Sequence, residues 1–213
     1  QVVFEAGVFI AATWLSGVLG EIYQAANQIA LSIATLTFMI ANGMSVVAMI
    51  RVGNYKGLED YVSLRRVAIS IFLFILLTQV VLGGLMGLLR YQLPELFLDT
   101  DKLSSSTNIG LVIEESAHLL LIAALFQIVD GIQTVALGAL RGLQDAKVPM
   151  ILSFISYWII AFPICYYLGL HTPLKTTGIW IGLLIGLAFS ALLQTSRFLL
   201  LSGRLIKNHP TEN

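Results

Sequence analysis

Two carboxylates stand inside long apolar stretches of this 213-residue chain. Glu5 lies in the run Val2–Leu19, and Asp130 lies in the run Leu111–Leu140. An acid at the centre of a membrane-spanning helix costs roughly 2.5–3.5 kcal/mol on insertion scales, so such residues usually serve a function. The alternative for Glu5 is a position near one membrane surface, if the first apolar run is incomplete.

Helix geometry places Asp130 close to the midplane of the bilayer and Glu5 somewhat below it, on the cytoplasmic side. Asp130 precedes the charged boundary at Arg141 by eleven residues, or ~16 Å of helix, which is near the middle of a ~30 Å hydrocarbon core. Glu5 is measured from the other side of the membrane: it precedes Gly20, at the outer end of its run, by fifteen residues, or ~22 Å of helix. The two acids could therefore share one pocket, which would hold a proton or a cation such as Na⁺, because two carboxylates in a low dielectric resist double ionisation. A cationic substrate competing for the same charge would give antiport.

Amide and hydroxyl groups lie one turn to either side of Asp130: Gln127, Gln133 and Thr134. They could complete a coordination shell or form hydrogen bonds between helices. Asn27 and Gln28 begin the second apolar run and could reach the pocket or cap the helix; of the two, we expect the cap. Besides these groups, the sequence has no cofactor motif, so we expect a protein that is not an enzyme.

The composition predicts which elements carry these residues. Hydrophobic residues make up 57% of the chain and charged residues 11%, with a mean hydropathy of +0.87. A soluble protein of this size cannot bury several apolar runs of about 20 residues, so we predict an all-α membrane protein. Six transmembrane helices are expected, at Val2–Leu19, Ala25–Ile50, Val67–Leu89, Leu111–Leu140, Met150–Leu170 and Ile179–Leu201.

We expect one six-helix transmembrane unit over residues 1–207 and a polar tail over residues 208–213. The first run opens abruptly, which predicts further sequence upstream. Nine of the twelve basic residues fall in the second and fourth connections or at the carboxyl end, and basic connections face the cytoplasm: Arg51, Lys56, Arg65, Arg66, Arg141, Lys147, Arg197, Arg204 and Lys207. Both chain ends are therefore expected to be cytoplasmic, with the bilayer as solvent and no role in nucleic-acid binding.

Three further residues have structural interpretations. Pro149 suits the first turn of a helix. Pro163 lies inside the fifth apolar run and should kink it. The single cysteine, Cys165, is expected to be a small buried side chain.

Several motifs resemble NorM-type MATE (multidrug and toxin extrusion) transporters, over nearly the whole chain. The run Phe126-Gln-Ile-Val-Asp130-Gly-Ile-Gln133, followed by Gly138-Ala-Leu-Arg141-Gly142-Leu-Gln-Asp145 and Pro149, resembles the tenth helix of that family and the loop after it. The segment Phe4-Glu5-Ala-Gly7 resembles the acidic part of the seventh helix. Similarity to the eighth helix is found at 26–31, 38–39 and 50–53.

The resemblance implies one six-helix lobe of a two-lobed transporter, without the amino-terminal lobe. It implies a cation site at Glu5 and Asp130, with cationic drugs exported across a bacterial inner membrane in exchange for protons or Na⁺. Phe126 departs from sodium-coupled relatives, which carry a tyrosine there, and Asn27 stands where a histidine is common. The segment containing Arg141, Gly142, Asp145 and Pro149 is expected to tie helix ends together by charge-assisted bonds.

Other interpretations remain open at this point. A flippase for a lipid-linked precursor would need a basic cavity for pyrophosphate, whereas this chain has acids. A membrane aspartyl protease would need a Gly-x-Gly-Asp run, which is absent around Asp130. The chain could also be a truncated, nonfunctional or structural fragment, or it could restore two lobes by forming a homodimer.

Overall fold

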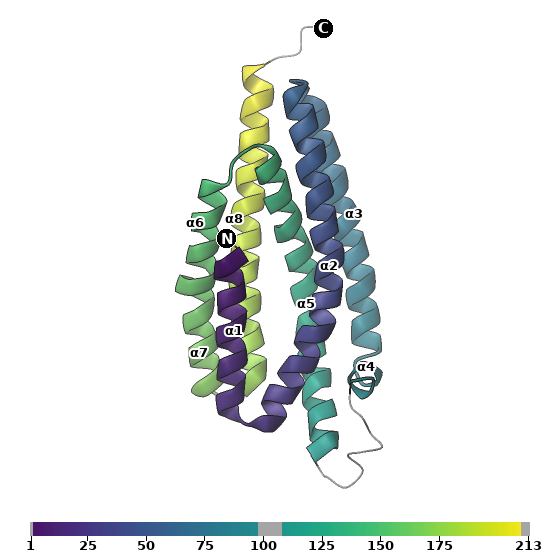
Figure 1. Cartoon of the computed structure of the whole chain (residues 1–213), viewed down its shortest axis with the longest axis vertical. Coiled ribbons are helices and arrows are strands. Elements are labelled where there is room, and N and C mark those ends of the chain that lie inside the picture. Colours follow the sequence, from purple (N-terminus) through teal and green to yellow (C-terminus); the bar gives the residue numbers. More distant parts are fainter. Residues whose placement is uncertain (1, 98–107, 210–213) are drawn as a thin grey trace.

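A computed structural model of the chain describes residues 2–97 and 108–209 as a bundle of long helices (Figure 1). The long helices are α1 (Val2–Leu19), α2 (Glu21–Gly57), α3 (Tyr61–Leu88), α5 (Asn108–Gly142) and α8 (Lys175–Asn208). A further helical stretch joins α6 (Lys147–Phe154), the π-helix η1 (Ile155–Ala161) and α7 (Phe162–Leu170), and α4 (Gln92–Glu95) is a single turn. Five stretches are long and apolar enough to cross a membrane, and α1 is a shorter apolar helix. The expected all-α membrane fold is confirmed.

Most helices extend beyond their apolar runs. The prediction for α1 is correct, but α2 continues to Gly57 and α8 continues to Asn208. Gly53 and Gly57, which lie beyond the apolar run predicted to end at Ile50, are therefore helical. The reason is that a helix satisfies its own backbone hydrogen bonds in water as in lipid, so hydropathy marks the membrane segment rather than the helix end. Residues 210–213 of the predicted tail lie outside the described residues.

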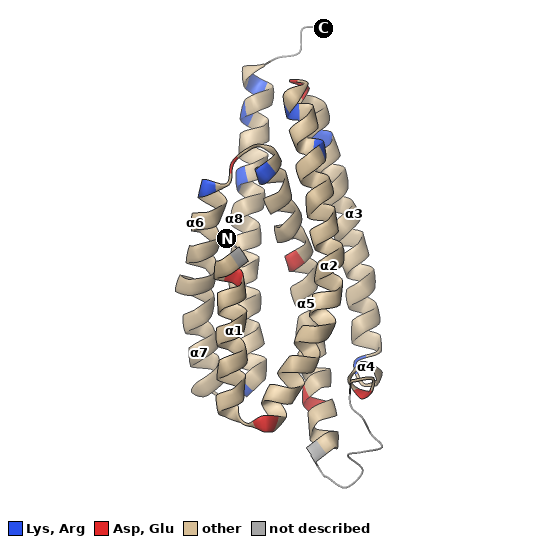
Figure 2. Ribbon diagram, in the orientation of Figure 1, with Lys and Arg blue, Asp and Glu red and all other residues tan. Residues whose placement is uncertain are grey.

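Helix α5 occupies the centre of the bundle and packs against α2, α3 and α8. Helix α1 packs against α2 and α7, on the opposite side of α2 from α3 (Figure 1). Most of the charged residues gather at the two ends of the bundle, with Lys and Arg concentrated at the end that carries the carboxyl terminus (Figure 2). Two acidic positions, one on α1 and one on α5, lie between these ends (Figure 2).

The interior contains two apolar clusters. One includes Leu15, Leu120 and Trp180, and the other includes Leu64, Leu140 and Phe198. Along α3, α5 and α8 the segments that contribute to the two clusters are separated by buried polar side chains: Gln79, Gln127, Asp130, Gln133, Ser190 and Gln194. A polar layer thus divides the core at the level of Asp130, and buried polar groups need hydrogen-bond partners within the bundle.

Pro163 lies at the start of α7, directly after the π-helix η1. Because proline lacks an N–H and its ring clashes with the preceding turn, the regular α-helical hydrogen bonds cannot continue past it. The chain responds with a π-helical segment, in which the Phe162 N–H donates to the Tyr157 carbonyl. Cys165 is 1% exposed, as predicted, and its thiol donates to the Ile179 carbonyl oxygen at 3.2 Å.

The turn between α2 and α3 predicts a pH dependence of stability. The Ser63 N–H donates to Asp60 Oδ1 at 3.0 Å, which caps α3, and hydrogen bonding to Ser63 lowers the pKa of this carboxyl. A lowered folded-state pKa means that the cap stabilises the fold above the ordinary aspartate pKa of ~3.9, and that this contribution is lost as the pH falls through the folded-state value. We expect Asp60→Ala to lower the Tm in detergent at neutral pH.

Measuring the Tm of the native chain and of Asp60→Ala at acidic pH tests this prediction. The Tm difference between the native chain and Asp60→Ala should shrink as the pH falls below the ordinary aspartate pKa of ~3.9, because protonation removes the negative charge that strengthens the bond from the Ser63 N–H. Asp60→Asn is the matched control, since asparagine caps helices without titrating. A Tm difference that is independent of pH would contradict the role of the ionised carboxylate.

Candidate functional site

Glu5 and Asp130 line the same cavity, of about 470 Å³, which is formed by α1, α2, α5 and α8. Glu5 comes from α1 and is half-buried, whereas Asp130 comes from the middle of α5 and is 4% exposed. Helices α2 and α8 supply the other walls. Because the two acids lie 125 positions apart in the chain, only the packing of α1 beside α2, α5 and α8 brings them to one site.

The walls of this cavity are mainly apolar and aromatic. Phe126 packs edge-to-face against Phe9 and against Trp180, with ring centroids 5.8 Å apart in both pairs. Phe38 of α2 also lines the cavity. Two carboxylates within aromatic walls form a site suited to an organic cation, because aromatic faces and carboxylates both attract positive charge.

Tyr157 is a site residue that the sequence analysis missed. Its hydroxyl lies 3.4 Å from Glu5 Oε1 and 3.4 Å from Gln133 Oε1, in donor geometry towards both. Gln133 in turn donates to Ser190 Oγ at 3.3 Å. Tyr157 lies within an apolar run, so no feature of the sequence marks it, and it is η1 that directs its side chain inward.

The amides around Asp130 have different surroundings. Gln127 lines the cavity and its Nε2 donates to the Gln79 carbonyl oxygen at 3.4 Å. Gln133 lies in the polar layer beside Tyr157 rather than in the wall of the large cavity. Gln127 therefore has both roles, since it lines the cavity and bonds to a neighbouring helix, whereas Gln133 forms bonds between helices outside this cavity.

The expected helix cap at Asn27 is wrong. Helix α2 begins at Glu21, so Asn27 lies well inside it, and its side chain is 1% exposed. Its Oδ1 accepts from Trp180 Nε1 at 2.9 Å, and its Nδ2 donates to Thr13 Oγ1 at 3.5 Å. Asn27 does not line the cavity, whereas the neighbouring Gln28 does.

The segment after α5 forms a charge-assisted bond, but the bond leads to the interior of α8 rather than to a second helix end, and it uses a different arginine. Asp145 Oδ2 accepts from Arg197 Nε of α8 at 2.5 Å, and not from Arg141. Gly142 lies against α2, where an added Cβ would meet the Met49 carbonyl oxygen at 2.7 Å. Pro149 is buried in the first turn of α6.

Arg141 and Glu5 both line a second, smaller cavity of about 60 Å³. Its other polar walls are neutral: Asn42, Ser45, Gln133 and Thr134. A region of this size has room for one or two water molecules. Arg141, expected to tie helix ends, therefore lies beside the carboxylate site.

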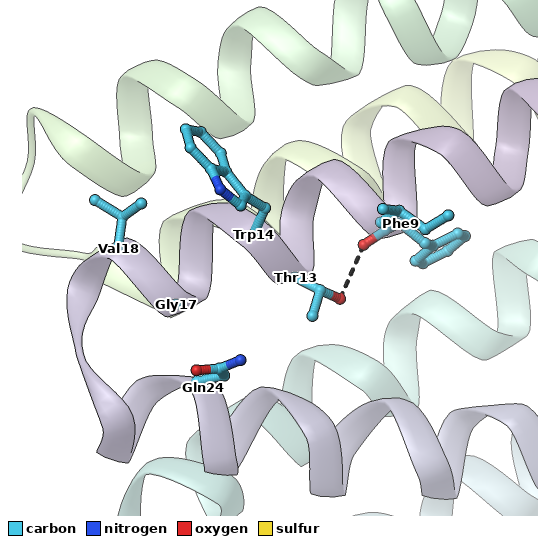
Figure 3. A pocket seen from close by; sticks show the side chains of 7 residues that line it. Phe9, Thr13, Trp14, Gly17, Val18 and Gln24 are labelled. Atoms are coloured by element: carbon cyan, nitrogen blue, oxygen red, sulfur yellow. Dashed lines mark hydrogen bonds between the residues drawn. The ribbon is translucent and has the colours of Figure 1, made fainter.

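A third hollow, of about 660 Å³, is an open groove between α1 and α2 (Figure 3). Thr13 donates to the Phe9 carbonyl within it, and Trp14 and Gln24 also line it (Figure 3). None of its lining residues is charged. In the part of the chain that the structure describes, no group of three or more His, Cys, Asp or Glu side chains is placed to hold a metal ion.

Comparison with known proteins agrees with this architecture. The MatE family model matches residues 1–167. This chain belongs to the MatE family. It is 42% identical over 175 residues to a probable multidrug resistance protein NorM of Rhodopseudomonas palustris, covering 82% of this chain and 36% of that protein. It is 37% identical over 211 residues to a probable multidrug resistance protein NorM of Xylella fastidiosa, covering 99% of this chain and 43% of that protein.

Solved structures share the fold of this MatE chain. A crystal structure of MATE in the bent conformation aligns with a TM-score of 0.81 at 15% identity, over 98% of this chain and 45% of that one. The outward-facing conformation of a multidrug resistance MATE family transporter of the MOP superfamily aligns with a TM-score of 0.80 at 18% identity, over 95% and 43%. The chain thus spans less than half the length of these MATE relatives.

Proposed function

We propose that this chain is the carboxy-terminal lobe of a secondary active antiporter that exports cationic drugs or xenobiotics in exchange for protons or Na⁺. The observation that carries the proposal is the placement of Glu5 and Asp130 in one aromatic-walled cavity. The NorM relatives are named as probable multidrug resistance proteins, which supports drug export as the function.

The carboxylate pair provides the coupling. When no cation is bound, two negative charges in an apolar cavity repel each other and attract any available cation. A proton or Na⁺ and an organic cation compete for this charge, so binding of one promotes release of the other. Alternating exposure of the cavity to the two sides of the membrane then converts competition into antiport.

The choice of coupling ion depends on the oxygen atoms near the acids. Phe126 has no hydroxyl to offer a metal ion, which favours proton coupling. Tyr157 places a hydroxyl beside Glu5, together with the amide oxygen of Gln133, and these neutral oxygens favour Na⁺ coupling. Both ions therefore belong in the test.

Membrane placement and partners follow from the same proposal. The basic end of the bundle (Figure 2) faces the cytoplasm, and the host membrane is a bacterial inner membrane. Transport requires a second lobe, because alternating access involves movement of one lobe against another. That lobe is either an amino-terminal half or a second copy of this chain in a homodimer.

The test measures ethidium extrusion from efflux-deficient cells under imposed proton and Na⁺ gradients, with the chain expressed alone and with an amino-terminal lobe of a NorM relative. We expect gradient-driven extrusion that falls to background, a loss of about ten-fold or more, in both Asp130→Asn and Glu5→Gln. Each substitution keeps the side-chain shape and removes the charge, so the loss isolates the electrostatic role.

The matched control is Glu95→Gln, which removes an exposed acid from α4 at the end of the bundle. It should extrude ethidium as the native chain does. Extrusion that survives both Asp130→Asn and Glu5→Gln would exclude the acid pair as the coupling site. Absence of extrusion from every combination, with the protein present in the membrane, would support a nonfunctional fragment instead.

A further inference from the structure

The second cavity places an arginine and a carboxylate around the same small polar space. Its α5 wall is formed by Gln133, Thr134, Leu137 and Arg141, which lie on successive turns of one helix face. Glu5 enters from α1, and Asn42 and Ser45 complete the wall from α2. Neutral polar side chains between two opposite charges support water molecules that bridge them.

Arg141 is available for this arrangement because the nearest acid in the sequence has another partner. Asp145 accepts from Arg197 at 2.5 Å. Across residues 2–97 and 108–209, no carboxylate lies within 4.0 Å of the Arg141 guanidinium. Among the described residues, Glu5 accepts one long bond, from the Tyr157 hydroxyl at 3.4 Å. Within this part of the chain, neither charge has a direct ion-pair partner, and both residues line the same cavity.

We propose that Arg141 is an intramolecular counter-ion for Glu5, which weakens cation binding at this carboxylate and so promotes cation release. This proposal rests on the proposed function, because it concerns cation release during transport. Its test measures proton binding at Glu5 and does not require transport. When the cation leaves Glu5, the guanidinium charge compensates the vacant carboxylate across the small cavity that both residues line. When a cation binds, it must compete with this fixed positive charge.

The charged and titratable side chains that line the two cavities with Glu5, or bond to it, come from α5 and η1. Helix α5 contributes Asp130 and Arg141, and η1 contributes Tyr157. The α2 residues that line the two cavities, such as Asn42 and Gln28, are neutral. Among the described residues that line the two cavities, Arg141 is therefore the one that carries a positive charge.

Coulomb's law gives the size of the effect. For example, a positive unit charge ~8 Å from a carboxylate weakens cation binding to that carboxylate about two-fold at the dielectric constant of water, and about thirty-fold at an effective dielectric constant of ~20. Because Arg141 is exposed and Glu5 is half-buried, we expect removal of the arginine charge to strengthen proton binding at Glu5 about five- to ten-fold. This corresponds to an upward shift of about 0.7–1 pH unit in the protonation midpoint of Glu5.

The experiment follows protonation of Glu5 in the purified chain in detergent, by infrared difference spectroscopy of the protonated-acid C=O band. The Glu5 band is assigned by its loss in Glu5→Gln. Arg141→Gln should shift the midpoint upward as stated, whereas Arg141→Lys should stay near the native value. Lys147→Gln is the charge-matched control, since Lys147 is also exposed at the basic end but does not line the cavity.

A second variant does not depend on the glutamine substitution. Arg141→Cys is labelled with a cationic or an anionic methanethiosulfonate reagent, and the buried Cys165 is protected. The cationic label should restore the native midpoint, and the anionic label should raise it further. Equal midpoints in Arg141→Gln and Lys147→Gln, or equal midpoints with both labels, would overturn the proposal while leaving the efflux result of Glu5→Gln unaffected.

Discussion

Gly138→Ala is expected to destabilise the bundle by about 3 kcal/mol or more, because α5 touches α2 at this glycine. A Cβ at Gly138 would lie 2.1 Å from the Ser45 carbonyl oxygen and 2.6 Å from Ser45 Oγ. The obstacle is backbone, so the contact is relieved only if the two helices move apart. Small residues allow this close approach of membrane helices, which are held together by packing rather than by the hydrophobic effect.

Unfolding of the purified chain by a denaturing detergent would measure this loss. The matched control is Gly84→Ala, because an added Cβ at Gly84 meets nothing within 4 Å and Gly84 also lies within a helix. Alanine should stabilise that position by about 0.5–1 kcal/mol through its higher helix propensity. The two substitutions are thus expected to have opposite signs, and equal stabilities would show that α2 and α5 do not pack closely at Ser45.

The sequence predicted helices better than it predicted their ends or their partners. Each apolar run became a helix because a bilayer leaves the backbone few other ways to satisfy its hydrogen bonds. The extension of α2 to Gly57 was missed because the apolar run ends at Ile50, and hydropathy marks the membrane segment rather than the helix end. Contacts such as Gly138 with Ser45 depend on how two helices are rotated about their axes, which hydropathy does not report.

The candidate site, like the fold, was predicted from the sequence only in part. Glu5 and Asp130 could be predicted because a charge in an apolar run conflicts with its surroundings. Tyr157 and Trp180 could not, because an aromatic residue in an apolar run is ordinary whether it faces lipid or a cavity. Asn27 was misinterpreted as a cap because the position of the helix start was wrong by about one turn.

Trp180 links the fold to the cavity, and its replacement is the second large effect that we expect. Its side chain is fully buried, lines the cavity with Phe126, and donates from Nε1 to Asn27 Oδ1 at 2.9 Å. Trp180→Ala should cost about 3–5 kcal/mol for the lost side chain, with a further ~1–3 kcal/mol for leaving a buried amide without its donor. Trp14→Ala is the control, since Trp14 is 69% exposed.

The contribution of the Asn27 bond can be separated from the contribution of volume. Trp180→Phe keeps much of the aromatic packing and removes the donor, and Asn27→Leu removes the acceptor. If the bond matters, the double variant should be more stable than the sum of the single losses predicts, because no buried group is then left unpaired. Strict additivity would mean that Trp180 acts through volume alone, so that its hydrogen bond to Asn27 is not needed to hold α8 against α2.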